Sequence, residues 1–117
     1  MGELPPQVQN MIAQLQTTQQ QLQMVVSQKL QLENALREIE EAIKEVEKAS
    51  EDTPIYKTVG TVLVKTKKDE VLKELNEKKE TIEVRIRALS RQEEKLKERL
   101  QELQNKVKSM LSGVQAG

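Results

Sequence analysis

The side chains that most often perform chemistry in proteins are absent from this sequence. It contains no cysteine and no histidine, so disulfides, thiol nucleophiles, imidazole acid–base catalysis and the usual zinc sites are excluded. The remaining candidates are carboxylates, which gather at Glu38, Glu40 and Glu41 and again at Glu93 and Glu94. Lysines or arginines lie near both groups, as on solvated helix surfaces. The sequence therefore predicts a protein that is not an enzyme and uses no metal and no cofactor.

The overall charge gives no reason to expect a nucleic acid or a membrane as partner. Nineteen basic and nineteen acidic residues cancel, which leaves no net field to attract DNA, RNA or anionic lipid. No apolar run approaches the ~20 residues of a membrane span, and no basic segment followed by an apolar stretch opens the sequence. The absence of cysteine fits a reducing compartment. We expect a cytoplasmic protein.

The composition favours long helices over an ordinary globule. The chain has one tyrosine, no phenylalanine and no tryptophan, and its apolar share of 36% accompanies a charged share of 32%. Leucine, isoleucine, valine and methionine recur with a seven-residue period, which starts with Val8 and Met11 in one segment and with Leu72 and Leu75 in another. Each frame lasts about six heptads, which is long enough to predict a coiled coil.

The limits of these helices follow from proline, glycine and capping residues. The first helix is expected over about 6–50, because proline suits the first turn, whose donors are unpaired anyway. The second is expected over about 69–112, with Asp69 as its N-cap and Gly113 as the residue that ends it. We further expect a flexible tail over 113–117, and a single domain over the whole chain.

The segment 53–66 between the two helices is typical of a β-hairpin, since it is rich in β-branched residues around one glycine. Because Val59 would resist a positive φ, we predict a three-residue loop that ends on a left-handed Gly60. This loop pairs Ile55 with Leu63.

The same reversal point brings the two heptad frames into register. If the chain folds back at Val59, Val8 faces Met110 and Ile43 faces Leu75, so a positions meet d positions as antiparallel coils require. The predicted fold class is therefore mainly α: a long antiparallel two-helix coiled coil joined by a β-hairpin. A parallel zipper would not require this agreement.

Three a positions of the predicted coil hold charged residues, namely Lys29, Lys79 and Glu93. Such residues can help to set the register or loosen the coil for motion. Alternatively, they extend their charged ends out of the seam into water, which is the commoner behaviour in a seam of only two helices.

The end of the coil farthest from the hairpin has an uncharged side and a charged side. Residues 4–28 carry no charge and ten of fourteen glutamines lie between Gln7 and Gln31, whereas 90–112 is densely charged. Apolar side chains near this end, which we call the terminal cluster, are candidates for binding varied partners. They are Leu4, Val8, Met11, Ile12, Leu15, Met110, Leu111 and Val114. The sequence equally allows that this end frays or that a neighbouring molecule covers it.

The hairpin carries more apolar surface than the helix ends can cover. A two-stranded ribbon is marginal in water and leaves two unpaired edges. It can fold onto its own coil, but we expect it to pair with other chains in a multi-stranded sheet or an oligomeric β-barrel body. The expected assembly residues are Ile55, Tyr56, Val59, Val62, Leu63 and Val64.

Together these segments resemble the beta-type subunits of archaeal prefoldin. The resemblance rests on the Leu4-Pro5 start, the glutamine-rich first helix, the segment from Ile55 to Val64 and a second helix with Arg91-Gln92-Glu93-Glu94. It spans essentially the whole chain, and the hairpin is its most specific part. One hairpin rather than two is similar to the beta type and unlike the alpha type.

The resemblance implies an ATP-independent molecular chaperone. In that family four beta and two alpha chains pool their hairpins into a double β-barrel body with projecting coiled coils. Unfolded client proteins bind at the coil tips, which correspond here to the terminal cluster, and pass to a group II chaperonin. The competing hypothesis is a structural adaptor whose coil recognises one specific folded partner by matching a and d positions.

Overall fold

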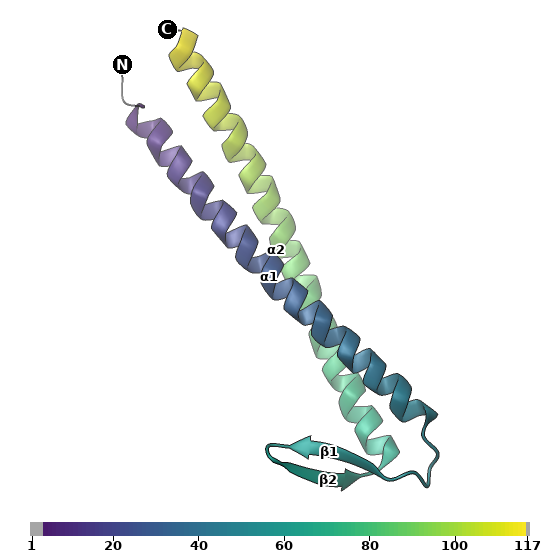
Figure 1. Ribbon diagram of the computed structural model, residues 1–117. Helices are drawn as coiled ribbons and strands as arrows, with labels where there is room; N and C mark the ends of the chain where they lie inside the picture. Colours follow the sequence, from purple (N-terminus) through teal and green to yellow (C-terminus); the bar gives the residue numbers. More distant parts are fainter. Residues whose placement is uncertain (1–3, 117) are drawn as a thin grey trace. The chain divides into compact units, whose positions relative to one another are not determined.

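The computed structural model describes residues 4–116, with side chains described as far as Gly113. Its elements are, in chain order, α1 (Pro6–Lys48), β1 (Ile55–Val59), β2 (Val62–Thr66) and α2 (Lys68–Ala116) (Figure 1). Two long helices joined by a β-hairpin are the elements that the sequence predicts. None of the described helices has a stretch both long and apolar enough to cross a membrane.

Helix α1 begins at the second of the two prolines, as predicted. Pro6 is its first residue, and the Pro5 carbonyl accepts the backbone N–H groups of Val8 at 2.9 Å and Gln9 at 3.1 Å. The Gln9 side-chain amide also donates to the Leu4 carbonyl at 2.7 Å. Proline fits here because it has no N–H group to leave unpaired in the first turn.

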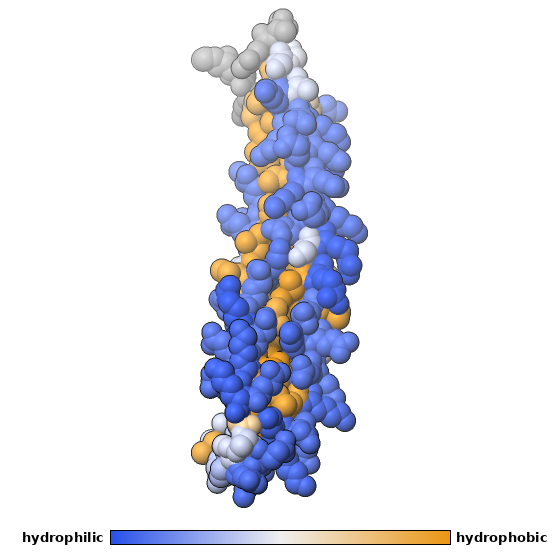
Figure 2. All heavy atoms as spheres, turned by 90° about the vertical axis from the view of Figure 1, so that its right-hand side faces the viewer, coloured by the Kyte–Doolittle hydropathy of each residue, from blue (hydrophilic) through white to orange (hydrophobic). Residues whose placement is uncertain are grey.

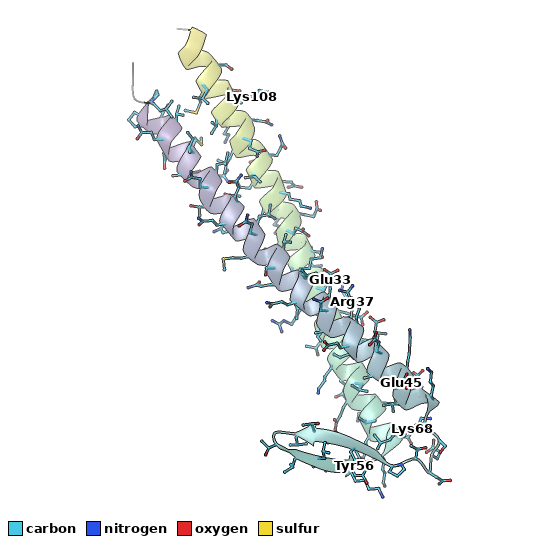
Figure 3. All side chains as sticks on the ribbon, viewed as in Figure 1. Glu33, Arg37, Glu45, Tyr56, Lys68 and Lys108 are labelled. Carbon is cyan, nitrogen blue, oxygen red and sulfur yellow. The ribbon has the colours of Figure 1, made fainter. Side chains whose placement is uncertain are left out.

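The other end of α1 is capped by a lysine from the start of α2. Lys68 Nζ donates to the carbonyl oxygens of Glu47 at 3.1 Å and Ala49 at 2.8 Å, and its side chain lies at the hairpin end of α2 in Figure 3. The last carbonyls of a helix lack intrahelical partners and carry its partial negative charge, so a cation stabilises them. The chain beyond α1 is thereby tied to the start of α2.

Helix α2 differs from the sequence prediction at both ends. It begins at Lys68, so Asp69 lies within the first turn and is not the N-cap. Asp69 is still well placed there, because negative charge in a first turn interacts favourably with the helix dipole. At the other end α2 continues through Gly113 to Ala116. Gly113 does not have a positive φ, and glycine within a helix costs only about 1 kcal/mol, so the predicted end at 112 is wrong; Gly117 lies outside the described residues.

The hairpin has a shorter loop than predicted. Val59 pairs with Val62 and Ile55 with Thr66, which leaves a two-residue turn. Gly60 has a φ of 61°, so its left-handed conformation is confirmed. The three-residue loop and the pairing of Ile55 with Leu63 are wrong. Glycine as the first residue of a two-residue turn matches the twist of the flanking strands and lets Val59 remain extended.

This register decides which side chains share a face of the hairpin. Directly opposite residues of an antiparallel pair lie on one face, and the pairs Tyr56–Lys65 and Thr58–Leu63 therefore form one face, on which Tyr56 and Leu63 are diagonal neighbours. The predicted register had placed Leu63 beside Ile55. A shift by an odd number of residues moves every β2 side chain to the opposite face. The other face consists of Ile55, Lys57, Val59, Val62, Val64 and Thr66.

The chain forms two compact units, Met1–Lys29 with Ala88–Gly117, and Leu30–Arg87. In the first unit the helices are antiparallel, since Gln14 binds Arg99 whereas Lys29, further along α1, binds the earlier Glu93 of α2. The predicted single domain over 1–117 stays a prediction.

The heptad positions line the interior of each unit. Every a and d residue from Val8 to Val46 and from Leu72 to Met110 is buried or half-buried. On the face drawn in Figure 2, apolar side chains form a narrow band between hydrophilic ones. The heptad frames are therefore confirmed as the packing surfaces of both helices.

Candidate functional site: two apolar surfaces

The terminal cluster brings together side chains from both helices of the first unit. Met11 of α1 and Met110 of α2 line a shallow, open recess with Asn105, Lys106 and Ser109. Methionine is unbranched and polarisable, so a recess of this kind can adapt to differently shaped apolar groups.

Other members of the cluster differ in their exposure. Leu4 is exposed, and Ile12, Leu15 and Leu111 are half-buried. Val8 has only 1% of its surface exposed, so in this conformation it packs within the seam and offers no surface to a partner. Val114 belongs to α2, but its side chain lies outside the described part.

One glutamine side chain of α1, that of Gln14, binds the charged side of α2. Arg99 Nη2 donates to Gln14 Oε1 at 3.1 Å. Thr18, a d residue that is almost fully buried, donates its hydroxyl to the Gln14 carbonyl at 2.8 Å, so its polar atom is satisfied within α1. The heptad pattern does not reveal the contact with Arg99, because Gln14 and Arg99 both lie beside the seam positions.

Two of the three charged a residues bind each other. Lys29 Nζ lies 3.0 Å from Glu93 Oε1, and the Glu93 side chain is only 15% exposed. Lys97 approaches the second carboxylate oxygen at 3.6 Å. In the predicted register, which folds back at Val59, Lys29 faces Leu89 and Glu93 faces Val25, so the contact between Lys29 and Glu93 was not expected. The ammonium group of Lys29 is therefore held at the seam by Glu93. This contact favours the interpretation that the charge of Lys29 helps to set the register of the two helices.

The pKa of Glu93 is lowered from its ordinary value, chiefly by the hydrogen bond from Lys29 and further by the positive charges of Lys29 and Lys97, against an opposing effect of desolvation. Because the pKa of Glu93 is lower in the folded chain than in the unfolded chain, its ionised carboxylate stabilises the fold. This stabilisation is fully present above the ordinary glutamate pKa and is lost as the pH falls through the lowered pKa of the folded chain. We therefore expect wild type to melt at a higher temperature than Glu93→Gln at pH 6, and the difference to shrink as the pH is lowered below the ordinary glutamate pKa. Circular dichroism melts of both proteins over this range measure it, and a constant difference contradicts the assignment.

The hairpin exposes five of its six predicted assembly residues. The exposed fractions of Tyr56, Val59, Val62, Leu63 and Val64 lie between 41% and 71%, whereas Ile55 is half-buried. Within the described chain the sheet has two strands, so each strand has one edge without a neighbour. Exposed apolar residues on unpaired strand edges are typical of surfaces that pair with another chain.

A second ion pair lies between the hairpin and α2. Lys57 Nζ lies 2.8 Å from Glu74 Oε1. The pKa of the Glu74 carboxyl is lowered, first by this hydrogen bond and then by the charge of Lys57. Sequence reasoning missed this contact, because neither the strand pattern nor the heptad frame relates a strand lysine to a particular helix glutamate. Among the described residues, no group of three acidic side chains is placed to bind a metal ion.

The comparisons with known proteins agree with this arrangement of helices and hairpin. A family model described as a prefoldin subunit matches residues 9–113. The chain belongs to the prefoldin family.

Several relatives of this chain are beta-type subunits. The chain is 59% identical over 112 residues to prefoldin subunit beta of Archaeoglobus fulgidus, covering 96% of this chain and 97% of that protein. It is 51% identical over 117 residues to the Thermococcus gammatolerans subunit, with full coverage of both. The crystal structure of the prefoldin beta subunit from Thermococcus strain KS-1 matches with a TM-score of 0.86 and 51% identity, covering 93% of this chain and 96% of that one. The predicted resemblance is confirmed.

Proposed function

We propose that this chain is a subunit of an ATP-independent molecular chaperone, which captures unfolded client proteins at the tips of its coiled coils and delivers them to a group II chaperonin. The observation that carries the proposal is the hairpin, whose apolar side chains are largely exposed in the single chain. An exposed apolar ribbon needs other subunits to cover it. Membership of the prefoldin family supports the same reading.

Assembly would occur through the hairpins. Strands of neighbouring subunits would pair along the free edges of β1 and β2 and close into β-barrels, which removes the unpaired edges altogether. The partner is a prefoldin alpha subunit, in a hexamer of two alpha and four beta chains. The family relationship supports this composition, and the two-stranded sheet supplies the edges that it requires.

Client binding would occur at the terminal cluster. A surface that holds many unrelated chains needs weak, distributed apolar contacts of about 1–2 kcal/mol each. The half-buried Ile12, Leu15 and Leu111 and the methionine recess offer such contacts. Several coils attached to one body raise the effective concentration, so that weak contacts together retain a client. Release then needs no nucleotide, and neither catalysis nor a cofactor enters the proposal. We place this activity in the cytoplasm.

The test is to mix the chain with an archaeal prefoldin alpha subunit, measure the mass in solution, and follow aggregation of a chemically denatured protein by light scattering. We expect a hexamer that suppresses aggregation without ATP. A mixture that stays monomeric contradicts the assembly. Saturable one-to-one binding of a folded partner, with no effect on aggregation, would instead support the structural adaptor.

A further inference from the structure

Two lysines hold the hairpin to the helix ends within the unit Leu30–Arg87. Lys57, in the middle of β1, binds the Glu74 carboxylate of α2 at 2.8 Å. Lys68, two residues after β2, binds the carbonyl oxygen of Glu47 in the last turn of α1 and that of Ala49 just beyond it. One contact therefore fixes the ribbon itself, and the other fixes the point where it joins α2.

The burial pattern shows which face of the ribbon is turned toward its own helices. The half-buried residues of the hairpin are Ile55, Lys57 and Thr66, and all three lie on one face. Ile55 and Thr66 pair at the end away from the turn, and Lys57 lies midway along β1. Tyr56 and Leu63, on the opposite face, are 58% and 71% exposed. Because most apolar side chains of the ribbon remain exposed, little apolar packing is available to fix its orientation on the helices.

We propose that Lys57 and Glu74 are positioning residues for subunit assembly. Their ion pair holds the Ile55 face against the chain's own helices, so that the face with Tyr56 and Leu63 and both strand edges are presented to a second subunit. The partner that fits is a β-strand whose apolar side chains cover Tyr56 and Leu63. A ribbon already oriented loses less conformational freedom on association than one that swings freely. This inference rests on the proposed function.

Charge exchange tests the pair. In mixtures with the alpha subunit, Lys57→Glu and Glu74→Lys each place like charges opposite one another, and we expect each to raise the concentration for half-assembly by about fivefold or more. The double variant Lys57→Glu/Glu74→Lys restores the attraction and most of the assembly. Glu80→Lys has the same charge change at an exposed α2 position without an ion pair among the described residues, and should assemble normally. Equal assembly of all four variants overturns the inference.

A direct measure of orientation separates this inference from the proposed function. Because the chain has no cysteine, spin labels can be placed on Thr61→Cys in the turn and Arg85→Cys in α2, and their distance distribution measured at low protein concentration. We expect a narrow distribution that broadens in Lys57→Glu and narrows again in the charge-exchanged variant. An unchanged distribution in Lys57→Glu overturns the positioning role. A narrow wild-type distribution in a chain that never assembles contradicts both the proposed assembly and any assembly role for the pair.

Discussion

Leu63→Asp is expected to dissociate the assembled body and leave the helical content of the chain unchanged. Leu63 is 71% exposed in the single chain, so the substitution costs little before assembly. In a barrel the same side chain would be covered, and an unpaired buried carboxylate costs several kcal/mol. Val62→Asp should act in the same way, since Val62 is also exposed. Sedimentation velocity measures the assembly, and far-ultraviolet circular dichroism measures the helices.

Two further variants separate loss of the interface from loss of the hairpin. Val84→Asp makes the same kind of change at an exposed apolar residue of α2, and its assembly should match wild type. Leu63→Thr introduces an uncharged β-branched residue, which favours strands, and should weaken assembly less than the aspartate. An unchanged sedimentation coefficient for Leu63→Asp would show that the hairpin does not form the subunit interface.

Removal of every member of the terminal cluster except Leu15 is expected to abolish protection of clients while the oligomer remains intact. The variant lacks residues 1–12 and 110–117, so that it loses Val8 and Met110, which occupy facing positions of the predicted register. Each lost apolar contact contributes about 1–2 kcal/mol. We therefore expect the chaperone concentration needed to suppress aggregation to rise by about tenfold or more. Light scattering of a denatured client and the mass of the assembly are the two measurements.

A full-length variant controls for the shortened helices. Ile12→Ser with Leu111→Ser changes two half-buried residues outside the a and d positions, and should reduce protection without removing a heptad layer. Full protection by the truncated protein would place client binding elsewhere in the assembly.

The heptad pattern was sufficient to predict both helices and their packing surfaces. The side chains at a and d positions repeat over about six heptads, and burying them together is the main stabilising effect available to a chain with one aromatic residue. Helix ends were predicted less well, because Gly113 indicates an end only when it takes the left-handed conformation. Its small cost within a helix allows α2 to continue.

The candidate surfaces were predictable as sets of residues, but the role of each member was not. The terminal cluster includes Val8, which the seam buries, and Met11 and Met110, which share a recess. Sequence spacing places these three residues at one end of the coil. It does not predict how much of each side chain remains exposed once the helices pack.

The sequence by itself determined the two coil-forming helices, the hairpin with left-handed Gly60, and the excess of apolar residues at both sites. These properties follow from local preferences and from periods read along one segment. Only the tertiary structure decided the hairpin register, the pairing of Lys29 with Glu93 and the attachment of Lys57 to Glu74. Each of these contacts depends on the relative position of two segments to within one residue. A long charged side chain can reach more than one residue of the neighbouring segment, so the spacing of residues in the sequence does not identify its partner.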